Sequence, residues 1–190
     1  MSQLRIIGGQ WRGRKLSFPD IEGLRPTGDR IRETVFNWLM PDIQGAQVLD
    51  LFSGSGALGL EALSRGAGTA MLIEKHPQVA ANLLSHLKTL HAENAKVLSM
   101  DALQFLQQGN SGTGYNIVFI DPPFSADLWQ PVVELLNQSQ WLAADAWIYV
   151  ETDKVSTWQA PENWYLHRDK MAGQVRYRLF TLDSDKSNHL

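Results

Sequence analysis

The stretch "VLDLFSGSGALGLEA", residues 48–62, joins an apolar run to a helical pattern through closely spaced glycines. Gly54, Gly56 and Gly59 have the spacing GxGxxG, and Asp50 stands just before them at the end of the apolar run. Between a buried strand and a helix, this spacing is typical of a turn that binds a nucleoside-containing cofactor. The stretch therefore predicts the first strand, turn and helix of a Rossmann-like α/β sheet.

Outward from this turn, strands and helices alternate. Short apolar runs predict buried strands at Gln47–Leu51, Ala70–Ile73, Lys96–Met100, Asn116–Ile120 and Ala146–Val150, with helical patterns near 57–65, 77–91, 101–108 and 127–138. Such alternation implies right-handed crossovers and a mostly parallel sheet with helices on both faces. After Glu151, the stretch "WYLHRDKMAGQVRYRLFTL" has a glycine near its middle and predicts an antiparallel hairpin at the sheet's edge.

The first 41 residues have a different pattern. "LRIIGGQWRGRKLSFP" predicts two short strands joined around Gly8-Gly9, a hairpin too small to be stable without packing on another element. The next stretch predicts an amphipathic helix, with Thr27 or Asp29 as its N-cap and Pro41 beyond its end. We therefore divide the chain into residues 1–41, a basic hairpin and helix, and residues 42–190, a cofactor-binding α/β domain.

Composition excludes several classes of protein. A chain of 190 residues with 44% hydrophobic and 19% charged residues can bury a full core. It contains no cysteine and five scattered histidines, so we expect neither disulfides nor a metal site. We find no 18-residue apolar run and no signal-peptide pattern. We therefore expect a cytoplasmic monomer that does not associate with a membrane.

Charge is unevenly distributed along the chain. Residues 1–34 carry seven Arg or Lys against four Asp or Glu, whereas the remainder carries ten against sixteen. A basic segment on an acidic body is a possible docking surface for a polyanion such as RNA, although most charged segments are simply solvated.

Charge also discriminates between cofactors at the glycine turn. A dinucleotide would bring a pyrophosphate to the turn, where an ionised Asp50 would repel it. S-Adenosylmethionine has no phosphate and carries an ammonium and a sulfonium, which an acidic strand end attracts. Two further acids follow predicted strands: Glu74, suited to ribose hydroxyls, and Asp101, suited to an adenine amino group. The pattern favours S-adenosylmethionine.

The fourth predicted strand ends in "DPPF", residues 121–124. Pro122 and Pro123 stop the strand because proline lacks the N–H that a sheet requires. An exocyclic amino group on a nucleobase is a poor nucleophile, because its lone pair is delocalised into the ring. The Asp121 carboxylate and the Pro122 carbonyl can accept its N–H bonds, while Phe124 offers a flat face to an unstacked base.

These motifs together resemble the class I S-adenosylmethionine-dependent N-methyltransferases. The segments "RIIGGQWRGRKL", "LRPTGDRIRETVFNWL", "GSGALGLEALSRGA" and "GQVRYRL" narrow the resemblance to the bacterial RsmD family, over residues 4–182. That family methylates the N2 atom of a guanine in 16S ribosomal RNA of the small (30S) subunit. The resemblance implies the same activity and partner here, and a seven-stranded sheet with one antiparallel strand.

The resemblance also implies a set of site residues. We expect catalysis at Asp121, Pro122, Pro123 and Phe124, and cofactor contacts from Thr27, Asp50, Phe52, Ser53, Gly54, Ser55, Gly56, Glu74, Lys75, Asp101 and Ala102. We expect RNA contacts from Arg5, Trp11, Arg12, Arg14, Lys15, Arg25, Arg30, Arg32 and Arg176.

Other functions remain open at this point. An enzyme acting on adenine N6 or cytosine N4 would use the same acceptor motif, but the chain has little room for a separate sequence-reading domain. A protein-glutamine methyltransferase is disfavoured by the basic segment, and cytosine C5 chemistry needs a cysteine. An NAD oxidoreductase would account for GxGxxG and Glu74 but not for Asp-Pro-Pro-Phe. A non-catalytic RNA-binding module would not need the acidic strand ends.

Overall fold

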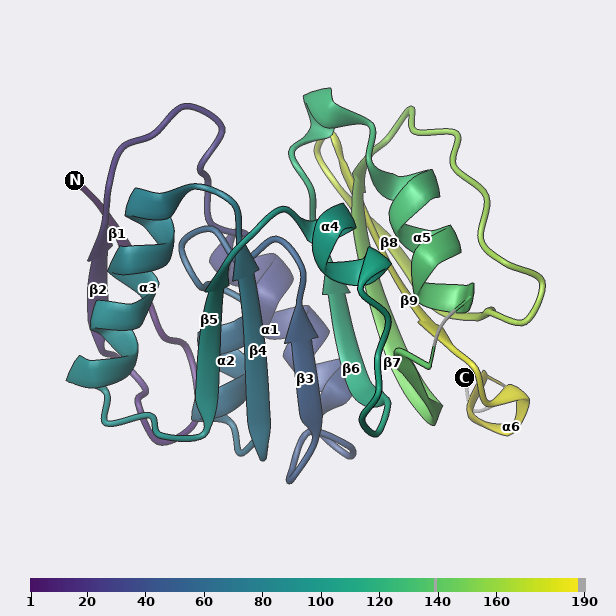
Figure 1. Cartoon of the computed structure of the whole chain (residues 1–190), viewed down its shortest axis with the longest axis horizontal. Coiled ribbons are helices and arrows are strands. Elements are labelled where there is room, and N and C mark those ends of the chain that lie inside the picture. Colours follow the sequence, from purple (N-terminus) through teal and green to yellow (C-terminus); the bar gives the residue numbers. More distant parts are fainter. Residues whose placement is uncertain (139, 188–190) are drawn as a thin grey trace. The chain divides into compact units, whose positions relative to one another are not determined.

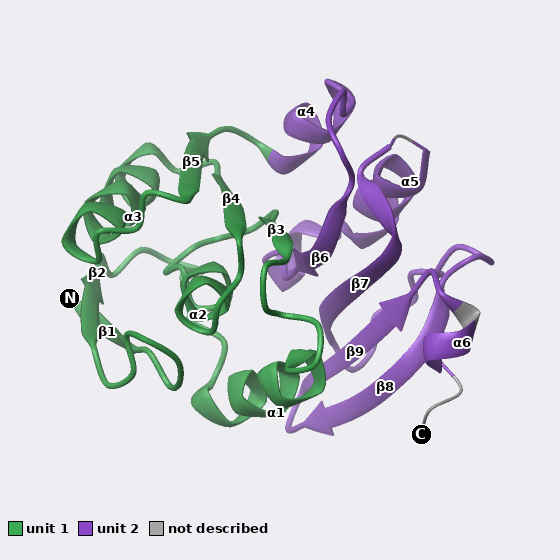
Figure 2. Cartoon of the chain, turned by 90° about the horizontal axis from the view of Figure 1, so that it is seen from below, with its two compact units in different colours: residues 1–101 green, residues 102–190 purple. Residues whose placement is uncertain are grey.

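The structure, a computed structural model, describes residues 1–138 and 140–187 of the chain. The chain divides into two compact units, Met1–Asp101 and Ala102–Leu190, coloured separately in Figure 2. Strands and helices alternate through both units (Figure 1), and each unit is described by itself.

Unit 1 contains three parallel strands, β3 (Gln47–Asp50), β4 (Thr69–Glu74) and β5 (Ala95–Ser99), with β4 in the middle. They are connected through α2 (Gly59–Ser64) and α3 (Pro77–Thr89). Both connections step in the same direction across the strands, so right-handed crossovers place both helices on one face. Fully buried side chains such as Val48, Leu60, Leu72 and Leu83 fill the space between them.

The N-terminal hairpin of unit 1 packs on the helices, as its small size requires. Its strands β1 (Ser2–Arg5) and β2 (Lys15–Phe18) pair antiparallel, and this prediction is confirmed. From α3, the side chains of Asn82 and His86 contact the Ser17 carbonyl at 3.2 and 2.8 Å. At Gly9, whose φ is +78°, an added Cβ would lie 1.9 Å from the Ser64 carbonyl oxygen. Only glycine fits at this approach of the hairpin loop to α2.

Helix α1 (Asp29–Leu39) is the predicted amphipathic helix, with Val35, Phe36 and Leu39 buried. Its N-cap is Gly28, which makes no side-chain capping bond, so the prediction of Thr27 or Asp29 as N-cap was wrong. Asp29 is instead the first residue of the helix, and its carboxylate binds the Arg32 guanidinium at 2.6 Å. The N-cap is by definition the residue before the first helical one, so Asp29 cannot occupy that position.

Unit 2 contains α4 (Ala102–Gln107), β6 (Tyr115–Ile120), η1 (Phe124–Ala126), α5 (Trp129–Gln138), β7 (Leu142–Asp153), β8 (Tyr165–Ala172), β9 (Val175–Thr181) and α6 (Ser184–Ser187). β6 and β7 are parallel, whereas β9 runs antiparallel to both β7 and β8. The apolar run Ile117–Ile120 is fully buried, as predicted. The predicted C-terminal hairpin is also confirmed, with Gly173 between its strands.

The strands have the order β5-β4-β3 in unit 1 and β6-β7-β9-β8 in unit 2, and the predicted Rossmann-like class is confirmed. β5 was expected to be a buried strand, but it is the sheet's first edge strand, and Leu98 is 36% exposed. An apolar run does not distinguish a central strand from an edge strand, because both pack one face on helices. Across the described parts of the chain, no helix has both the length and the apolar character needed to cross a membrane.

Candidate active site

The turn after β3 adopts a conformation that requires glycine. Gly54 and Gly56 have φ angles of +52° and +87°. A Cβ at Gly56 would lie 2.6 Å from Leu60 and 2.8 Å from Leu83, and a Cβ at Gly54 would lie 2.9 Å from Leu24. The turn is stabilised by a hydrogen bond from the Gly56 N–H to the Ser53 carbonyl at 2.8 Å. Glycine at these two positions therefore lets the backbone turn where neighbouring leucine side chains leave no room for a Cβ.

Asp50 lies beneath this turn and is almost completely buried. Its Oδ2 accepts a hydrogen bond from the Gly59 N–H at 3.1 Å, whereas Oδ1 has no hydrogen-bond partner among the described residues. Burial raises the pKa of Asp50 to about 7, and the nearby N–H groups of Gly59 and Phe52 offset only part of that rise. The negative charge of Glu74 contributes further in the same direction. A buried acceptor without a partner is a site where a cation or donor would bind favourably.

Glu74 ends β4 and connects it to the glycine turn. One carboxylate oxygen accepts a hydrogen bond from the Gly54 N–H and the other from the His76 N–H, both at 2.9 Å. Each oxygen retains a lone pair for a hydroxyl donor, as the predicted ribose contact requires. Asp101 follows β5 and is half-buried, next to the buried Ala102.

The remaining predicted cofactor residues of unit 1 differ in exposure. Ser53 and Ser55 are buried in the turn and Thr27 is buried before α1, whereas Phe52 is half-buried and Lys75 is exposed. Asp50 Oδ1, which has no hydrogen-bond partner among the described residues, fits the ammonium group of S-adenosylmethionine. The glycine turn fits a cofactor that packs closely against the backbone. We refer to Asp50, Phe52–Gly56, Glu74 and Asp101 as the predicted cofactor residues, or cofactor residues for short.

In unit 2, Asp121 directly follows β6, with Pro122 buried and Pro123 exposed after it. Phe124 opens the short helix η1 and is half-buried. Its ring lies 5.9 Å from the ring of Trp129, tilted by 44°, which holds the Phe124 ring in place from one side. The motif thus presents a carboxylate, a rigid carbonyl and an aromatic ring within four residues. We refer to Asp121–Phe124 as the acceptor motif.

A buried cluster next to this motif was not predicted. Tyr149 is fully buried, and its hydroxyl donates to Glu151 Oε1 at 2.8 Å. Burial raises the pKa of Tyr149 well above its usual value, with further contributions from the negative charges of Glu151 and Asp121. Trp129 Nε1–H donates to the Glu151 carbonyl at 2.9 Å. The sequence signal was present, because Glu151 follows the apolar run 146–150 as Asp121 follows 116–120.

Most of the predicted RNA-contacting residues are accessible. Arg5, Arg12, Arg14, Lys15, Arg25 and Arg30 are exposed, and Trp11 is half-buried. Arg176 in unit 2 is 36% exposed and forms an ion pair with Asp169 at 2.6 Å.

Arg32 is the exception, because only 1% of its side chain is exposed. It contacts the Glu61 carboxylate at 3.3 Å, the Asp29 carboxylate at 2.6 Å and the Arg5 carbonyl at 3.0 Å. The prediction that Arg32 contacts RNA was therefore wrong. A basic residue in a charged helix is usually exposed, but Arg32 faces α2 and connects α1 to α2 through Glu61.

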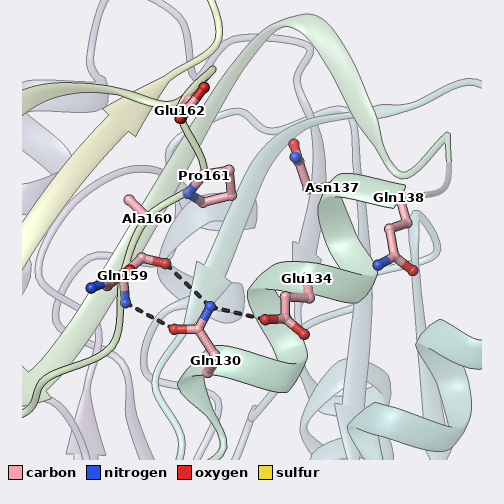
Figure 3. A pocket seen from close by; sticks show the side chains of 8 residues that line it. All are labelled: Gln130, Glu134, Asn137, Gln138, Gln159, Ala160, Pro161 and Glu162. Carbon is pink, nitrogen blue, oxygen red and sulfur yellow. Dashed lines mark hydrogen bonds between the residues drawn. The ribbon is translucent and has the colours of Figure 1, made fainter.

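Unit 2 also contains a surface cavity (Figure 3). It is lined by α5 and the loop before β8, through Gln130, Glu134, Asn137, Gln138, Gln159, Ala160, Pro161 and Glu162. Gln130 of α5 connects the helix to the loop by two hydrogen bonds with the Gln159 backbone, and it also donates to Glu134 on the same helix. None of the predicted site residues lines it. Among the described residues, no three His, Asp or Glu side chains are grouped closely enough to hold a metal ion.

A Rossmann-like sheet with a glycine turn beside an acidic strand end is the fold of the class I methyltransferases. The chain belongs to the family described as Conserved hypothetical protein 95, which matches residues 4–181. It is 56% identical over 179 residues to Ribosomal RNA small subunit methyltransferase D of Escherichia coli strain K12, covering 94% of this chain and 89% of the relative. The predicted RsmD-family membership is thereby confirmed.

Solved structures agree with this assignment. The Escherichia coli protein yhhF has a TM-score of 0.87 and 52% identity, covering 95% of this chain and 98% of the other. A more distant RNA methyltransferase from Salinibacter ruber, solved in complex with S-adenosyl-L-homocysteine, has a TM-score of 0.63 and 15% identity, covering 84% and 95%. The second likeness is one of fold.

Proposed function

We propose that the chain is an S-adenosylmethionine-dependent methyltransferase that methylates the exocyclic N2 amino group of one guanine in 16S ribosomal RNA of the small subunit. The observation that carries this proposal is the 56% identity, over nearly the whole chain, to a ribosomal RNA small subunit methyltransferase. The cofactor residues and the acceptor motif supply the chemical groups that the reaction needs.

The cofactor residues account for binding of the methyl donor. When bound, S-adenosylmethionine supplies a methyl group on a positively charged sulfur, which is an excellent leaving group. Asp50 Oδ1 would accept from the amino group of the methionine moiety, and Glu74 would hold the ribose hydroxyls. An ammonium at Asp50 favours its carboxylate form, so binding should release a proton near neutral pH.

The acceptor motif accounts for activation of the guanine. The Asp121 carboxylate and the Pro122 carbonyl each accept one N–H of the amino group, which orients the nitrogen lone pair toward the methyl group. Phe124 stacks on the base, and Asp121 or water takes the proton that the nitrogen loses. Because no bond to hydrogen must break first, orientation and electrostatics supply most of the rate.

Labelled-methyl transfer tests this function directly. The purified chain and S-adenosylmethionine with a labelled methyl group are incubated with transcribed 16S RNA, free or reconstituted into subunits, and nucleosides are then separated. We expect N2-methylguanosine at one position. N6-methyladenosine or N4-methylcytidine would instead support the alternative of a different amino-methyltransferase.

A pair of variants tests the acceptor motif. Asp121→Ala should lower turnover at least about hundredfold while leaving the cofactor affinity within a few-fold, because the lost contact is made to the reacting amino group. Asp127→Asn, an exposed change six residues later, should leave turnover unchanged. Normal turnover by Asp121→Ala in a single-turnover assay would remove Asp121 from the mechanism.

A further inference from the structure

Glu151 is a buried acid next to the acceptor motif that the reaction above does not use. β6 and β7 pair in parallel with Ile120 opposite Val150, so Asp121 and Glu151 are the next residues along two neighbouring strands. The rings of Phe119 and Tyr149 make an edge contact at 6.0 Å, which places them on one face of these strands. Residues two apart in a strand share a face, and the Tyr149–Glu151 hydrogen bond keeps Glu151 on this one.

The surroundings fix the position of Glu151 but do not saturate its carboxylate. Tyr149 donates to Oε1, while Trp129, which contacts Phe124, donates to the Glu151 backbone. A carboxylate has about four acceptor sites, so the single bond from Tyr149 leaves acceptor capacity. Only 7% of Glu151 is exposed, so a donor that meets it would be largely withdrawn from water.

Guanine differs from the other bases in what lies beside its amino group. Its N1 carries a proton adjacent to the N2 amino group, whereas the ring nitrogen beside the amino group of adenine or cytosine is an acceptor. A carboxylate facing that nitrogen accepts a hydrogen bond from guanine and repels the lone pair of the other two bases. Buried groups that form hydrogen bonds to a substrate N–H discriminate strongly against analogues that lack it.

We propose that Glu151 determines base specificity by accepting the N1–H of the target guanine while Asp121 accepts from its N2 amino group. The inference rests on the proposed function, since it assumes guanine as the substrate.

The test uses 2-aminopurine, which keeps the amino group at C2 but has no proton on N1. The guanine that the wild type methylates is first located, and 16S RNA with 2-aminopurine at that position is then made by ligation and reconstituted into subunits. We expect the wild type to prefer guanine over 2-aminopurine at least about hundredfold in kcat/KM. Glu151→Gln should reduce this ratio at least tenfold, because an amide can donate to the unprotonated N1.

Two comparisons make the result decisive. The ratio is measured with one enzyme preparation, so it does not depend on the folded fraction of a variant. Tyr149→Phe removes the hydrogen bond that Tyr149 donates to Glu151 but keeps the Glu151 carboxylate, and should keep the ratio within threefold of the wild type. An unchanged ratio in Glu151→Gln, or an equal fall in Tyr149→Phe, would overturn the proposal while leaving N2 methylation intact. Wild-type methylation of a base other than guanine would overturn both.

Discussion

The carboxyl group of Asp50 should make the folded chain less stable as the pH rises, and Asp50→Asn should remove this effect. Burial raises the pKa of Asp50 from 3.8 to about 7. Between these values the folded chain keeps a proton that the unfolded chain releases, so the free energy of unfolding falls as the pH rises through this window. Above pH 7 both states have released the proton, and the loss is complete.

The size of the effect follows from the pKa difference. A shift of about three units corresponds to about 4 kcal/mol, since one unit is about 1.36 kcal/mol. Between about 1 and 2 kcal/mol is already lost at pH 5, where the unfolded carboxyl is ionised, which leaves about 2–3 kcal/mol between pH 5 and pH 8. The amide introduces its own cost of about 1–3 kcal/mol at the unpartnered position. That cost does not depend on pH and cancels between the two conditions.

Calorimetric unfolding of cofactor-free protein at pH 5, 6, 7 and 8 measures this change. For a chain of this length, the Tm difference between Asp50→Asn and the wild type should move in favour of the variant by about 5–10 °C from pH 5 to pH 8. Asp145→Asn is the control, because it removes a carboxylate from a side chain that is 59% exposed. A Tm difference for Asp50→Asn that is equal at pH 5 and pH 8 would refute the reasoning.

Asp50→Asn should also weaken S-adenosylmethionine binding at least about tenfold, because a carboxylate facing an ammonium is replaced by a neutral amide. A variant that gains stability at high pH but loses affinity for S-adenosylmethionine identifies Asp50 as a ligand-binding acid and not a structural one. Functional sites commonly retain such a destabilising group.

Three further perturbations have defined outcomes. Arg12→Ala with Arg14→Ala should reduce the steepness of the plot of log RNA affinity against log salt concentration by about 1–2. The control, Lys88→Ala with Lys96→Ala, removes the same charge outside the N-terminal segment and should leave this slope unchanged. Equal slopes for the two double variants would mean that the hairpin does not dock RNA. Arg32→Met should destabilise the chain by about 2–3 kcal/mol in denaturant unfolding, because the buried Glu61 carboxylate loses one of its two cations and keeps only Arg65. A loss below about 1 kcal/mol would contradict the assigned role. Gly56→Ala should weaken cofactor binding and lower the free energy of unfolding more than Gly109→Ala does. Both glycines have a positive φ, but only a Cβ at Gly56 would meet other side chains. Equal losses of stability would mean that contact with these side chains is unimportant.

The alternation of strands and helices was predictable because it depends on local periodicity and on residues that punctuate the chain. The glycine turn after β3 and the prolines after β6 mark the ends of strands regardless of what packs around them. The status of β5 as an edge strand depends on which strands pair, and that is decided by contacts between distant segments. The apolar run alone does not indicate how many neighbouring strands its strand has in the sheet.

The role of Arg32 was not predictable for a related reason. Its neighbours in sequence, Arg30 and Glu33, are exposed, and the helix pattern alone does not exclude an exposed Arg32. It is buried because Glu61 lies on α2, twenty-nine residues away. The same Glu61 carboxylate accepts the N–H groups of Ile7 and Gly8, so one buried acid connects the hairpin, α1 and α2.

The acidic strand ends show where residue patterns stop being informative about chemistry. Asp50, Glu74 and Glu151 each follow an apolar run, yet one is buried with an orphaned oxygen, one is fixed to the glycine turn, and one is bound by a tyrosine hydroxyl. Burial and hydrogen-bond partners determine whether such an acid is protonated and which donor it can accept. Asp50 and Glu151 therefore need different tests. The role of Asp50 is tested by the pH dependence of stability in the absence of ligand. The role of Glu151 is tested only by a substrate such as 2-aminopurine, whose N1 has no proton.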